Sequence, residues 1–208
     1  MLILASASPR RQELLRNAGI PFIVEPTDIP EIPQPGEAPT AFVERLAGEK
    51  ARVIARHHVN DFVLGADTTV VVGDEILNKP ADKGDAARML AMLSGRTHQV
   101  ITGVCVIVPA TENRKLRTER IRSERTSVTF EKLTRQDIDF YVRTGESMDK
   151  AGAYAIQGMA SRWISRIQGD YFNVVGLPVA LVYRTLRELG FEEREKAGPS
   201  SSLRSGSG

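Results

Sequence analysis

The chain has 208 residues, of which 41% are apolar and 26% are charged, and its formal net charge is +2 at pH 7. This length allows one good core or two small lobes around a cleft, and the small net charge excludes a broad positive field for nucleic acid. Cys105 is the only cysteine, which excludes a disulfide framework and a thiolate zinc cluster within the chain, and no apolar run approaches the ~20 residues of a membrane span.

The N-terminal residues carry no sign of a targeting segment. The apolar run at residues 2–5 is too short for the core of a signal peptide, and arginines follow it rather than precede it. We therefore expect a cytoplasmic protein that binds neither nucleic acid nor membranes, and whose anion sites come from the local placement of charge.

The first predicted elements are a strand at residues 2–5 and a helix at residues 9–18. Ser8 is a good N-cap, Pro9 suits the first helical position, and Gly19 provides the C-terminal stop. This places a strand–helix junction at the serine-rich segment between the two elements.

That helix begins with two arginines, Arg10 and Arg11, although the first turn of a helix favours anions by roughly 0.3–1 kcal/mol. A strand that ends in hydroxyl residues such as Ser6 and Ser8 and leads into a helix can bind phosphate oxygens through backbone N–H and guanidinium groups. An ordinary junction with solvated arginines explains the same residues, and this segment alone does not decide between the two.

Strands and helices alternate along most of the remaining chain. Apolar runs predict further strands over residues 22–24, 62–66, 69–72 and 100–108, several of them buried on both faces. Helical spacing predicts helices over residues 40–55, 82–93, 134–143 and 179–189. The alternation is typical of an α/β fold. We expect one domain over residues 1–191 and a disordered polar tail over residues 192–208.

Two segments follow less regular patterns. Residues 116–133 predict one or two polar strands in a region of closely spaced arginines. Because no aromatic side chain lies between these arginines, a solvated sheet edge explains them better than a nucleic-acid patch. Residues 152–158 are bracketed by glycines and predict a tight loop or a short strand.

Asp67 is a carboxylate inside an apolar run. It separates the strand predicted at residues 62–66 from the one predicted at residues 69–72, so we expect it at or near the end of a buried strand. Carboxylates are seldom buried without a partner, which favours a metal ion or a catalytic proton transfer. A turn aspartate that caps a hairpin is the alternative.

Three further charged residues stand at unusual positions. Lys50 lies on the apolar stripe of its predicted helix, where its ammonium group either extends to the surface or meets a buried anion. Lys79 precedes Pro80 at the start of another helix, and Glu31 lies in a proline-rich loop where nothing local requires a carboxylate. If these residues converge, they provide carboxylates for Mg²⁺ and cations for phosphate oxygens, as metal-assisted phosphoryl chemistry requires.

Motifs of several common enzyme classes are missing from the sequence. It contains no Walker A loop, no G-x-G-x-x-G, no H-E-x-x-H and no G-x-S-x-G, so P-loop, dinucleotide-binding, zincin and serine-hydrolase functions lose support. The three histidines show no metal-ligand spacing: His57 and His58 are more typical of an exposed helix end, and His98 of a turn.

Six short motifs, in chain order, carry a resemblance to the Maf-type nucleotide pyrophosphatases. They are LASASPRR at residues 4–11, GADT at 65–68, KP at 79–80, LSGRTH at 93–98, MDKAGAY at 148–154 and NVVGLP at 173–178. Each is weak alone, but six in order make a chance likeness very improbable, and the resemblance runs from residue 2 to about residue 189.

The resemblance implies an α/β fold similar to that of the inosine triphosphate pyrophosphatases, with an elongated mixed sheet, helices around it, a cleft between two lobes, and a homodimer. The implied activity is hydrolysis of a nucleoside triphosphate to the monophosphate and pyrophosphate with a divalent metal cation, Mg²⁺ or Mn²⁺.

By motif position, the resemblance makes Asp67 the proton acceptor and places Glu31, Lys50 and Lys79 in the metal and phosphate site, with Glu31 and Asp67 as metal ligands. At residues 29–33 the chain departs from the family, which commonly has two adjacent acidic residues there. The assignment of Glu31 depends on this departing segment.

The resemblance places Arg10, Thr68 and Gln157 where the family discriminates between bases. Thr68 and the segment at residues 156–158 resemble the branch that acts on dTTP and UTP, and differ from the branch that prefers 7-methyl-GTP. Hydrogen bonds from Thr68 and Gln157 would then reject the wrong base.

The sequence therefore leads to a hypothesis in which Asp67 accepts a proton from a water that attacks the α-phosphorus, and pyrophosphate departs. Lys50, Lys79, Arg10 and Arg11 would neutralise charge on the phosphates. Four alternatives stay open: a non-catalytic nucleotide-binding regulator of septum formation and cell division, since family members are linked to both; the 7-methyl-GTP pyrophosphatase branch; a phosphatase; and a structural α/β protein.

Overall fold

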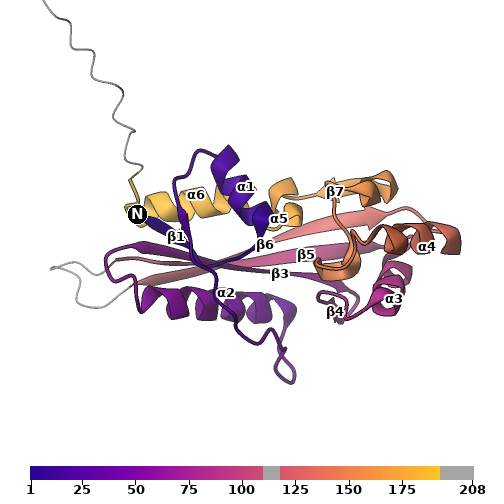
Figure 1. Ribbon diagram of the computed structural model, residues 1–208, viewed down its shortest axis with the longest axis horizontal. Helices are drawn as coiled ribbons and strands as arrows, with labels where there is room; N and C mark the ends of the chain where they lie inside the picture. The colour runs from indigo at the N-terminus through magenta and orange to yellow at the C-terminus, as the bar shows by residue number, and fades with distance from the viewer. Residues whose placement is uncertain (110–117, 193–208) are drawn as a thin grey trace, which may run out of the picture.

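The computed structural model describes residues 1–109 and 118–192, and its helices surround one elongated sheet (Figure 1). The strands are β1 (Leu2–Leu4), β2 (Ile23–Val24), β3 (Phe62–Val72), β4 (Glu75–Leu77), β5 (Thr97–Ile107), β6 (Glu119–Phe130) and β7 (Ile164–Gln168). The α-helices are α1 (Pro9–Asn17), α2 (Pro39–Ala55), α3 (Lys83–Leu93), α4 (Arg135–Thr144), α5 (Tyr171–Val175) and α6 (Val179–Glu188), and two 3₁₀ helices are η1 (Ala151–Ala153) and η2 (Met159–Trp163).

The seven strands form a single mixed sheet in the order β2-β1-β3-β5-β6-β7, with β4 paired to β3 outside this path. β1 runs parallel to β2 and β3, whereas β3, β5, β6 and β7 pair antiparallel. The long strands β3, β5 and β6 give the sheet its length. The predicted α/β class with an elongated mixed sheet is confirmed.

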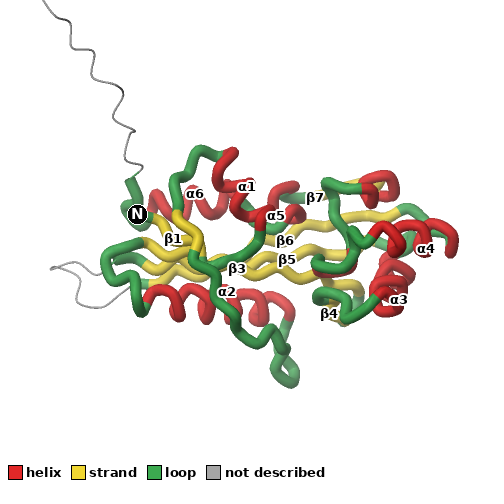
Figure 2. The backbone as a smooth tube through the Cα atoms, in the orientation of Figure 1, coloured by secondary structure: helices red, strands yellow, loops and turns green. Residues whose placement is uncertain are grey.

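Helices cover both faces of the sheet. Figures 1 and 2 show α2 alone along one face, with α1, α5 and α6 on the other, while α3 and α4 gather at the far end beside β4 and β7. Because side chains alternate along a strand, Val63 of β3 packs with Ala47 and Ala51 of α2, and Leu64 belongs to the larger core on the opposite face.

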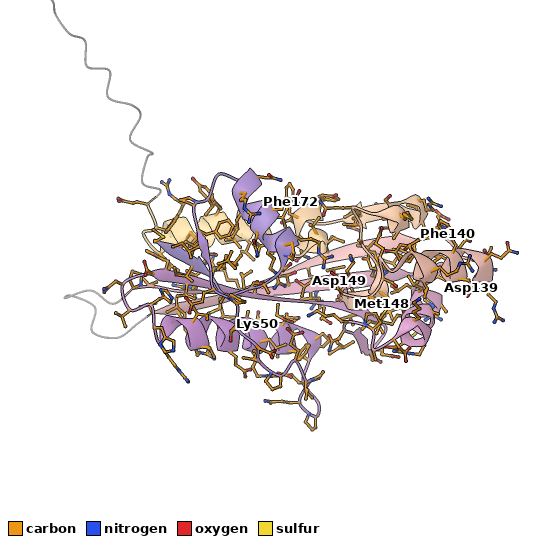
Figure 3. All side chains as sticks on the ribbon, viewed as in Figure 1. Lys50, Asp139, Phe140, Met148, Asp149 and Phe172 are labelled. Atoms are coloured by element: carbon orange, nitrogen blue, oxygen red, sulfur yellow. The ribbon has the colours of Figure 1, made fainter. Side chains whose placement is uncertain are left out.

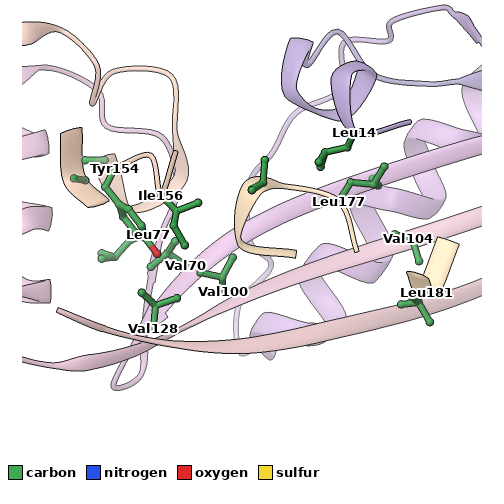
Figure 4. Packing of buried hydrophobic residues seen from close by; sticks show 14 of the residues in the cluster. Leu14, Val70, Leu77, Val100, Val104, Val128, Tyr154, Ile156, Leu177 and Leu181 are labelled. Carbon is green, nitrogen blue, oxygen red and sulfur yellow. The ribbon is translucent and has the colours of Figure 1, made fainter. Parts of the chain in front are cut away.

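That larger core continues to the far end of the sheet. Figure 4 shows Val70, Val100 and Val128 from three neighbouring strands packed with Tyr154 and Ile156 from the segment around η1. All five side chains are buried, so this part of the fold holds the η1 segment against the sheet by apolar contact.

Two glycines let α2 approach the sheet closely. A Cβ atom at Gly65 of β3 would lie 2.2 Å from the carbonyl oxygen of Ala47, and one at Gly103 of β5 would lie 2.3 Å from that of Val43. Both obstacles are backbone atoms of α2, which cannot move aside as a flexible side chain can. The absence of these two Cβ atoms therefore sets the distance between α2 and the sheet.

We expect Gly103→Ala to lower the free energy of unfolding by about 2–3 kcal/mol, because the methyl group overlaps the carbonyl of Val43 and displaces α2. Urea denaturation measures the change. Gly48→Ala, within α2 itself, is the matched control: the atoms nearest its new methyl belong to the side chain of Arg52, and alanine is the better helix former. Equal stability of the two variants would contradict the packing argument.

The structure corrects two predictions in the central strands. Residues 62–66 and 69–72 are not two strands but one, and Asp67 lies in its middle, paired with Gly103 of β5, rather than at a strand end or in a turn. The pairing between β3 and β5 continues through Asp67, because the ammonium of Lys50 on α2 forms an ion pair with the Asp67 carboxylate. His98 lies in β5 rather than in a turn, buried against Tyr154 and Phe130.

The remaining predicted segments match the structure in part, and some of them lie outside the described residues. Residues 152–158 form a 3₁₀ turn and loop, so the loop is the correct one of the two predicted alternatives. Strands β4 and β7 and helix α5 were not predicted. The polar tail predicted at residues 192–208 lies outside the described residues except for Glu192, as do Arg114, Lys115, Leu116 and Arg117 of the charged stretch. The tail and the domain boundary at residue 191 stay predictions. Within the described residues, none of the helices has the length and apolar character needed to cross a membrane.

Candidate active site

The site lies at a gap in the edge of β3. On this edge β1 pairs with residues 62–64 and β4 pairs with residues 70–72. No described strand pairs with the residues between them on that side, which include Asp67 and Thr68. A cavity of about 330 Å³ opens at the gap.

The cavity collects all ten residues that the sequence singled out as site residues. They are Ser6, Ser8, Arg10, Arg11, Glu31, Lys50, Asp67, Thr68, Lys79 and Gln157. These residues come from α1, α2, β3 and four loops, and they meet because β1 and β4 end on either side of the same stretch of β3.

Lys50 is at the centre of the charged part of the cavity. Its Nζ lies 2.6 Å from Glu31 Oε1 and 2.6 Å from Asp67 Oδ1, and only 8% of its side chain is exposed. Lys79 Nζ lies 3.5 Å from Glu31 Oε2 and is largely exposed. Of the two alternatives for Lys50, the buried anion is therefore correct, and the ammonium does not extend to the surface.

The two carboxylates differ in environment. Burial raises the pKa of Asp67 above its ordinary value, and Lys50 and Arg11 act in the opposite direction. Partial burial acts to raise the pKa of Glu31 as well, but Lys50 and Lys79 together lower it below its ordinary value. Asp67 is thus the carboxylate better suited to take up a proton, and Glu31 the one that stays charged.

The two arginines at the start of α1 have different surroundings. Arg11 is buried and uses four of its five N–H donors on the protein. The acceptors are the carbonyl oxygens of Gly176 and Ala66 at 2.9 Å each, Thr68 Oγ1 at 2.9 Å and Ser6 Oγ at 3.2 Å. Arg11 therefore bonds the open edge of β3 and retains at most one donor for a ligand.

Arg10 is half-buried and lines the cavity. Within the described residues its guanidinium forms no hydrogen bond or ion pair. Asp149 also lines the cavity. Partial burial acts to raise the pKa of Asp149, but Lys150 and, more weakly, Arg10 lower it below its ordinary value. Figure 3 labels Asp149 on the segment after α4 and Lys50 on α2. Of the two arginines, Arg10 is the one available to an anionic ligand.

Ser8 stands at the predicted N-cap of α1, but its side chain forms no cap hydrogen bond. Instead its backbone N–H donates to Ser6 Oγ over 3.3 Å, while Pro9 occupies the first helical position as predicted. Ser8 lines the cavity, and its hydroxyl donates no hydrogen bond to a described residue. The capping role was wrong, and the hydroxyl remains available to a ligand.

Thr68 and Gln157 occupy different parts of the cavity wall. Thr68 Oγ1 accepts from Arg11 and lies 2.9 Å from Thr102 Oγ1, so it is held in place by the interior. Gln157 is exposed and comes from the loop between η1 and η2. Its side chain makes no hydrogen bond within the described part of the chain.

Several lining residues were not singled out from the sequence. Asn78, Asp149, Lys150 and Tyr154 also line the cavity. Asp149, Lys150 and Tyr154 belong to the motif at residues 148–154, so its presence was the available signal. A second hollow, lined by residues 5–7 and 26–29, shares Ser6, Glu31, Lys50 and Lys79 with the first. The charged cluster therefore borders two open spaces.

The donor set suits a hard divalent cation that takes few protein ligands. Within residues 1–109 and 118–192 no group of three or more histidine, cysteine or acidic side chains gathers for a metal. Glu31 and Asp67 do converge on one ammonium, and no described residue donates a hydrogen bond to Asp67 Oδ2. Two carboxylates with further oxygens from phosphate or water are a usual set for Mg²⁺.

Comparison with known proteins extends over nearly the whole described chain. The family described as "Maf-like protein" matches residues 1–189. A protein of Koribacter versatilis (strain Ellin345) named "dTTP/UTP pyrophosphatase" is 55% identical over 189 residues, which cover 91% of this chain and 94% of that protein. A protein of the same name from Symbiobacterium thermophilum is 50% identical over 190 residues, covering 91% and 94%.

Among solved structures, the Staphylococcus aureus Ham1 protein matches 62% of this chain and 71% of its own, with 15% sequence identity and a TM-score of 0.44. This likeness is partial, and the arguments that follow depend on the sequence relatives and the cavity.

Proposed function

The chain belongs to the Maf-like protein family, and from this we propose that it hydrolyses dTTP and UTP to the nucleoside monophosphate and pyrophosphate. The observation that carries the proposal is the convergence of Glu31, Lys50, Asp67 and Lys79 in one cavity. Carboxylates and ammonium groups in contact are the groups that phosphoryl transfer uses. Relatives that bear the name dTTP/UTP pyrophosphatase and are about half identical supply the substrate class.

In the proposed reaction Asp67 acts as the general base. A water oxygen forms a bond to the α-phosphorus, the bond from that phosphorus to the bridging α,β oxygen breaks, and pyrophosphate leaves with the electron pair. The proton of the water goes to Asp67. Oδ1 of Asp67 is already bound to Lys50, so Oδ2 is the oxygen that accepts it. Burial raises the pKa of this carboxyl, which makes it a stronger base than an exposed aspartate.

Cations of the cavity offset the charge of the triphosphate. Lys79 and Arg10 are accessible and face the open space, whereas Lys50 holds the two carboxylates in position. A divalent cation, Mg²⁺ or Mn²⁺, would be held by Glu31 and Asp67, and when bound it neutralises phosphate charge and polarises the phosphoryl group. Fixed cations placed where charge develops supply much of the catalysis in phosphoryl transfer.

Base choice is assigned to Gln157 and Thr68. The amide of Gln157 carries both donors and an acceptor, and it has no protein partner in the described chain, so it can pair with the polar edge of thymine or uracil. Thr68 is fixed by Arg11 and Thr102 and limits the orientation of the ligand. A site of this kind rejects a base whose edge leaves these groups unpaired.

A nucleotide panel tests the proposal. Purified protein with Mg²⁺ is incubated separately with dTTP, UTP, CTP, GTP and 7-methyl-GTP, and monophosphate, pyrophosphate and orthophosphate are quantified. Monophosphate with pyrophosphate, fastest from dTTP and UTP, supports the proposal. Release of orthophosphate would indicate a phosphatase. Nucleotide binding without turnover would indicate a regulator, and a preference for 7-methyl-GTP would indicate the other branch of the family.

The pH dependence of kcat/KM provides a separate prediction. Asp67 must be ionised to accept a proton, so activity falls as the pH falls through its pKa, by about tenfold per pH unit. Burial raises this pKa, whereas a divalent cation held by Asp67 would lower it, so we expect the midpoint of the acid limb to move to lower pH as the Mg²⁺ concentration is raised. Circular dichroism over the same pH range shows whether the protein stays folded while its activity falls. A kcat/KM that does not fall with pH while the protein stays folded would contradict the assignment.

A further inference from the structure

Gln157 is held in place by its neighbours in the chain rather than by its own side chain. It lies between η1 and η2, exposed and on the cavity wall, and its amide has no partner among the described residues. The position of this amide therefore depends on whatever anchors the backbone on each side of it.

Two backbone N–H groups, each two residues from Gln157, supply the anchors. The N–H of Ala155 donates to the hydroxyl oxygen of Tyr141 over 3.1 Å. The N–H of Met159 donates to Glu146 Oε1 and Oε2 over 3.1 and 3.2 Å. The Tyr141 hydroxyl in turn donates to Glu146 Oε1 over 2.8 Å. Tyr141 and Glu146 thus form one clamp, which binds the loop on both sides of Gln157.

The clamp contacts the loop closely. A Cβ atom at Gly158 would lie 2.0 Å from Glu146 Oε1, so a side chain at this position would displace the carboxylate from the place it occupies. The N–H of Gly158 also donates to the carbonyl of Ala155 over 3.1 Å, which closes the turn that carries Gln157. Glycine at position 158 therefore lets the carboxylate reach the N–H of Met159 while the turn stays closed.

Both clamp residues are themselves fixed. Tyr141 is buried in α4, and its ring meets Trp163 edge to face at 5.7 Å. Burial raises the pKa of Tyr141, so its hydroxyl keeps the proton that it donates. Glu146 follows Gly145, the left-handed residue that ends α4, and its carbonyl accepts from Lys150 over 2.7 Å. Helix α4 and the turn after it thus support the loop.

We propose that Tyr141 and Glu146 are positioning residues for base selection, because they hold the loop that presents Gln157 to the nucleobase. This inference rests on the proposed function, in which Gln157 pairs with the base. The clamp lies on α4 and the turn after it, whereas Lys50 and Asp67 lie on α2 and β3. Its loss should therefore disturb recognition of the base more than the reaction at the α-phosphorus.

Two substitutions that break the clamp, Tyr141→Phe and Glu146→Ala, provide the test. In each we expect the ratio of kcat/KM for dTTP to that for CTP to fall by about tenfold, since a misplaced hydrogen-bonding group no longer rejects the wrong base. The change should appear in KM for dTTP, with kcat altered by less than about threefold. Glu146→Gln retains an acceptor for Met159 and should restore most of the discrimination.

Matched controls come from exposed residues of α6. Tyr183→Phe removes a tyrosine hydroxyl and Glu188→Ala removes a carboxylate that pairs with Arg122, both away from the cavity lining. Neither should change the dTTP to CTP ratio. Thermal denaturation of every variant separates loss of discrimination from loss of fold, and Gln157→Ala gives the discrimination expected when the base contact itself is removed.

The outcomes separate the two levels of the argument. Loss of discrimination in Gln157→Ala but not in folded Tyr141→Phe and Glu146→Ala would overturn the clamp and leave the proposed function intact. A parallel fall of kcat for every nucleotide would also overturn it, because that is the effect of general structural damage. Unchanged discrimination in Gln157→Ala would remove the base contact and the clamp together, and absence of dTTP hydrolysis by the unmodified chain would refute the proposed function.

Discussion

We expect Asp67→Asn to lower the rate of pyrophosphate release from dTTP by at least about 10³-fold, because a neutral amide cannot accept the proton of the attacking water. Asparagine has nearly the same shape as aspartate, and its carbonyl oxygen can still accept the hydrogen bond that Lys50 gives to Asp67 Oδ1 over 2.6 Å. The cavity should therefore keep its form.

Two measurements check this expectation. Single-turnover pyrophosphate release with Mg²⁺ reports the chemical step. Equilibrium titration with dTTP in the absence of a divalent cation reports binding, which should stay within about threefold of wild type since the phosphate-binding side chains Lys79 and Arg10 remain. Asp139→Asn, an exposed position of α4, is the matched control and should leave both values unchanged. Near-normal release from Asp67→Asn would remove this residue as the base.

The second large effect is expected from Lys50→Met. The substitution keeps an unbranched side chain, one heavy atom shorter, but leaves Glu31 and Asp67 without the ammonium that lies 2.6 Å from each. Removing one partner of a buried ion pair costs about 3–5 kcal/mol because a buried charge is left uncompensated. We expect the free energy of unfolding to fall by about 3 kcal/mol, near the lower end of this range, since the charge of Arg11 still interacts favourably with Asp67. The rate of dTTP hydrolysis should fall as well, because Lys50 holds Glu31 and Asp67 in position.

The pH dependence of this loss distinguishes charge from packing. In Lys50→Met the pKa of Asp67 rises further, because one of the two cations that lower it is gone. As the pH falls through the pKa values of the two carboxylates, they take up protons, the uncompensated charge disappears, and the stability difference from wild type should shrink. Urea denaturation at several pH values measures it, with Lys132→Met, at an exposed lysine, as the control. A difference independent of pH would point to lost packing instead.

Most elements of the fold could be predicted because their signals are local. The helix at residues 134–143 matches α4, which has the predicted stop at Gly145 and a capping box formed by Thr134 and Asp137. The strand at residues 100–108 matches most of β5. Apolar periodicity, caps and glycines act within a few residues. Short elements such as β4, β7 and α5 carry too few residues for such a signal.

Charged side chains inside these elements were harder to interpret, because burial of a charge depends on a partner elsewhere in the chain. Asp67 was expected at a strand end, yet β3 continues through it because Lys50 of α2 lies against its carboxylate. Arg10 and Arg11 are neighbours with equal sequence signals, yet Arg11 bonds the open edge of β3 and Arg10 faces the cavity. Sequence spacing does not distinguish these environments.

By itself the sequence determined the α/β class, the order of the long elements, the family resemblance and the types of residue available for phosphoryl chemistry, since all of these are properties of local pattern and composition. Only the tertiary structure decided which charges meet. β1 and β4 pair with the same edge of β3 and leave a gap between them, and the two glycines facing α2 let that helix bring Lys50 to Asp67. Contacts across such distances arise from strand pairing and helix packing, which depend on the whole chain.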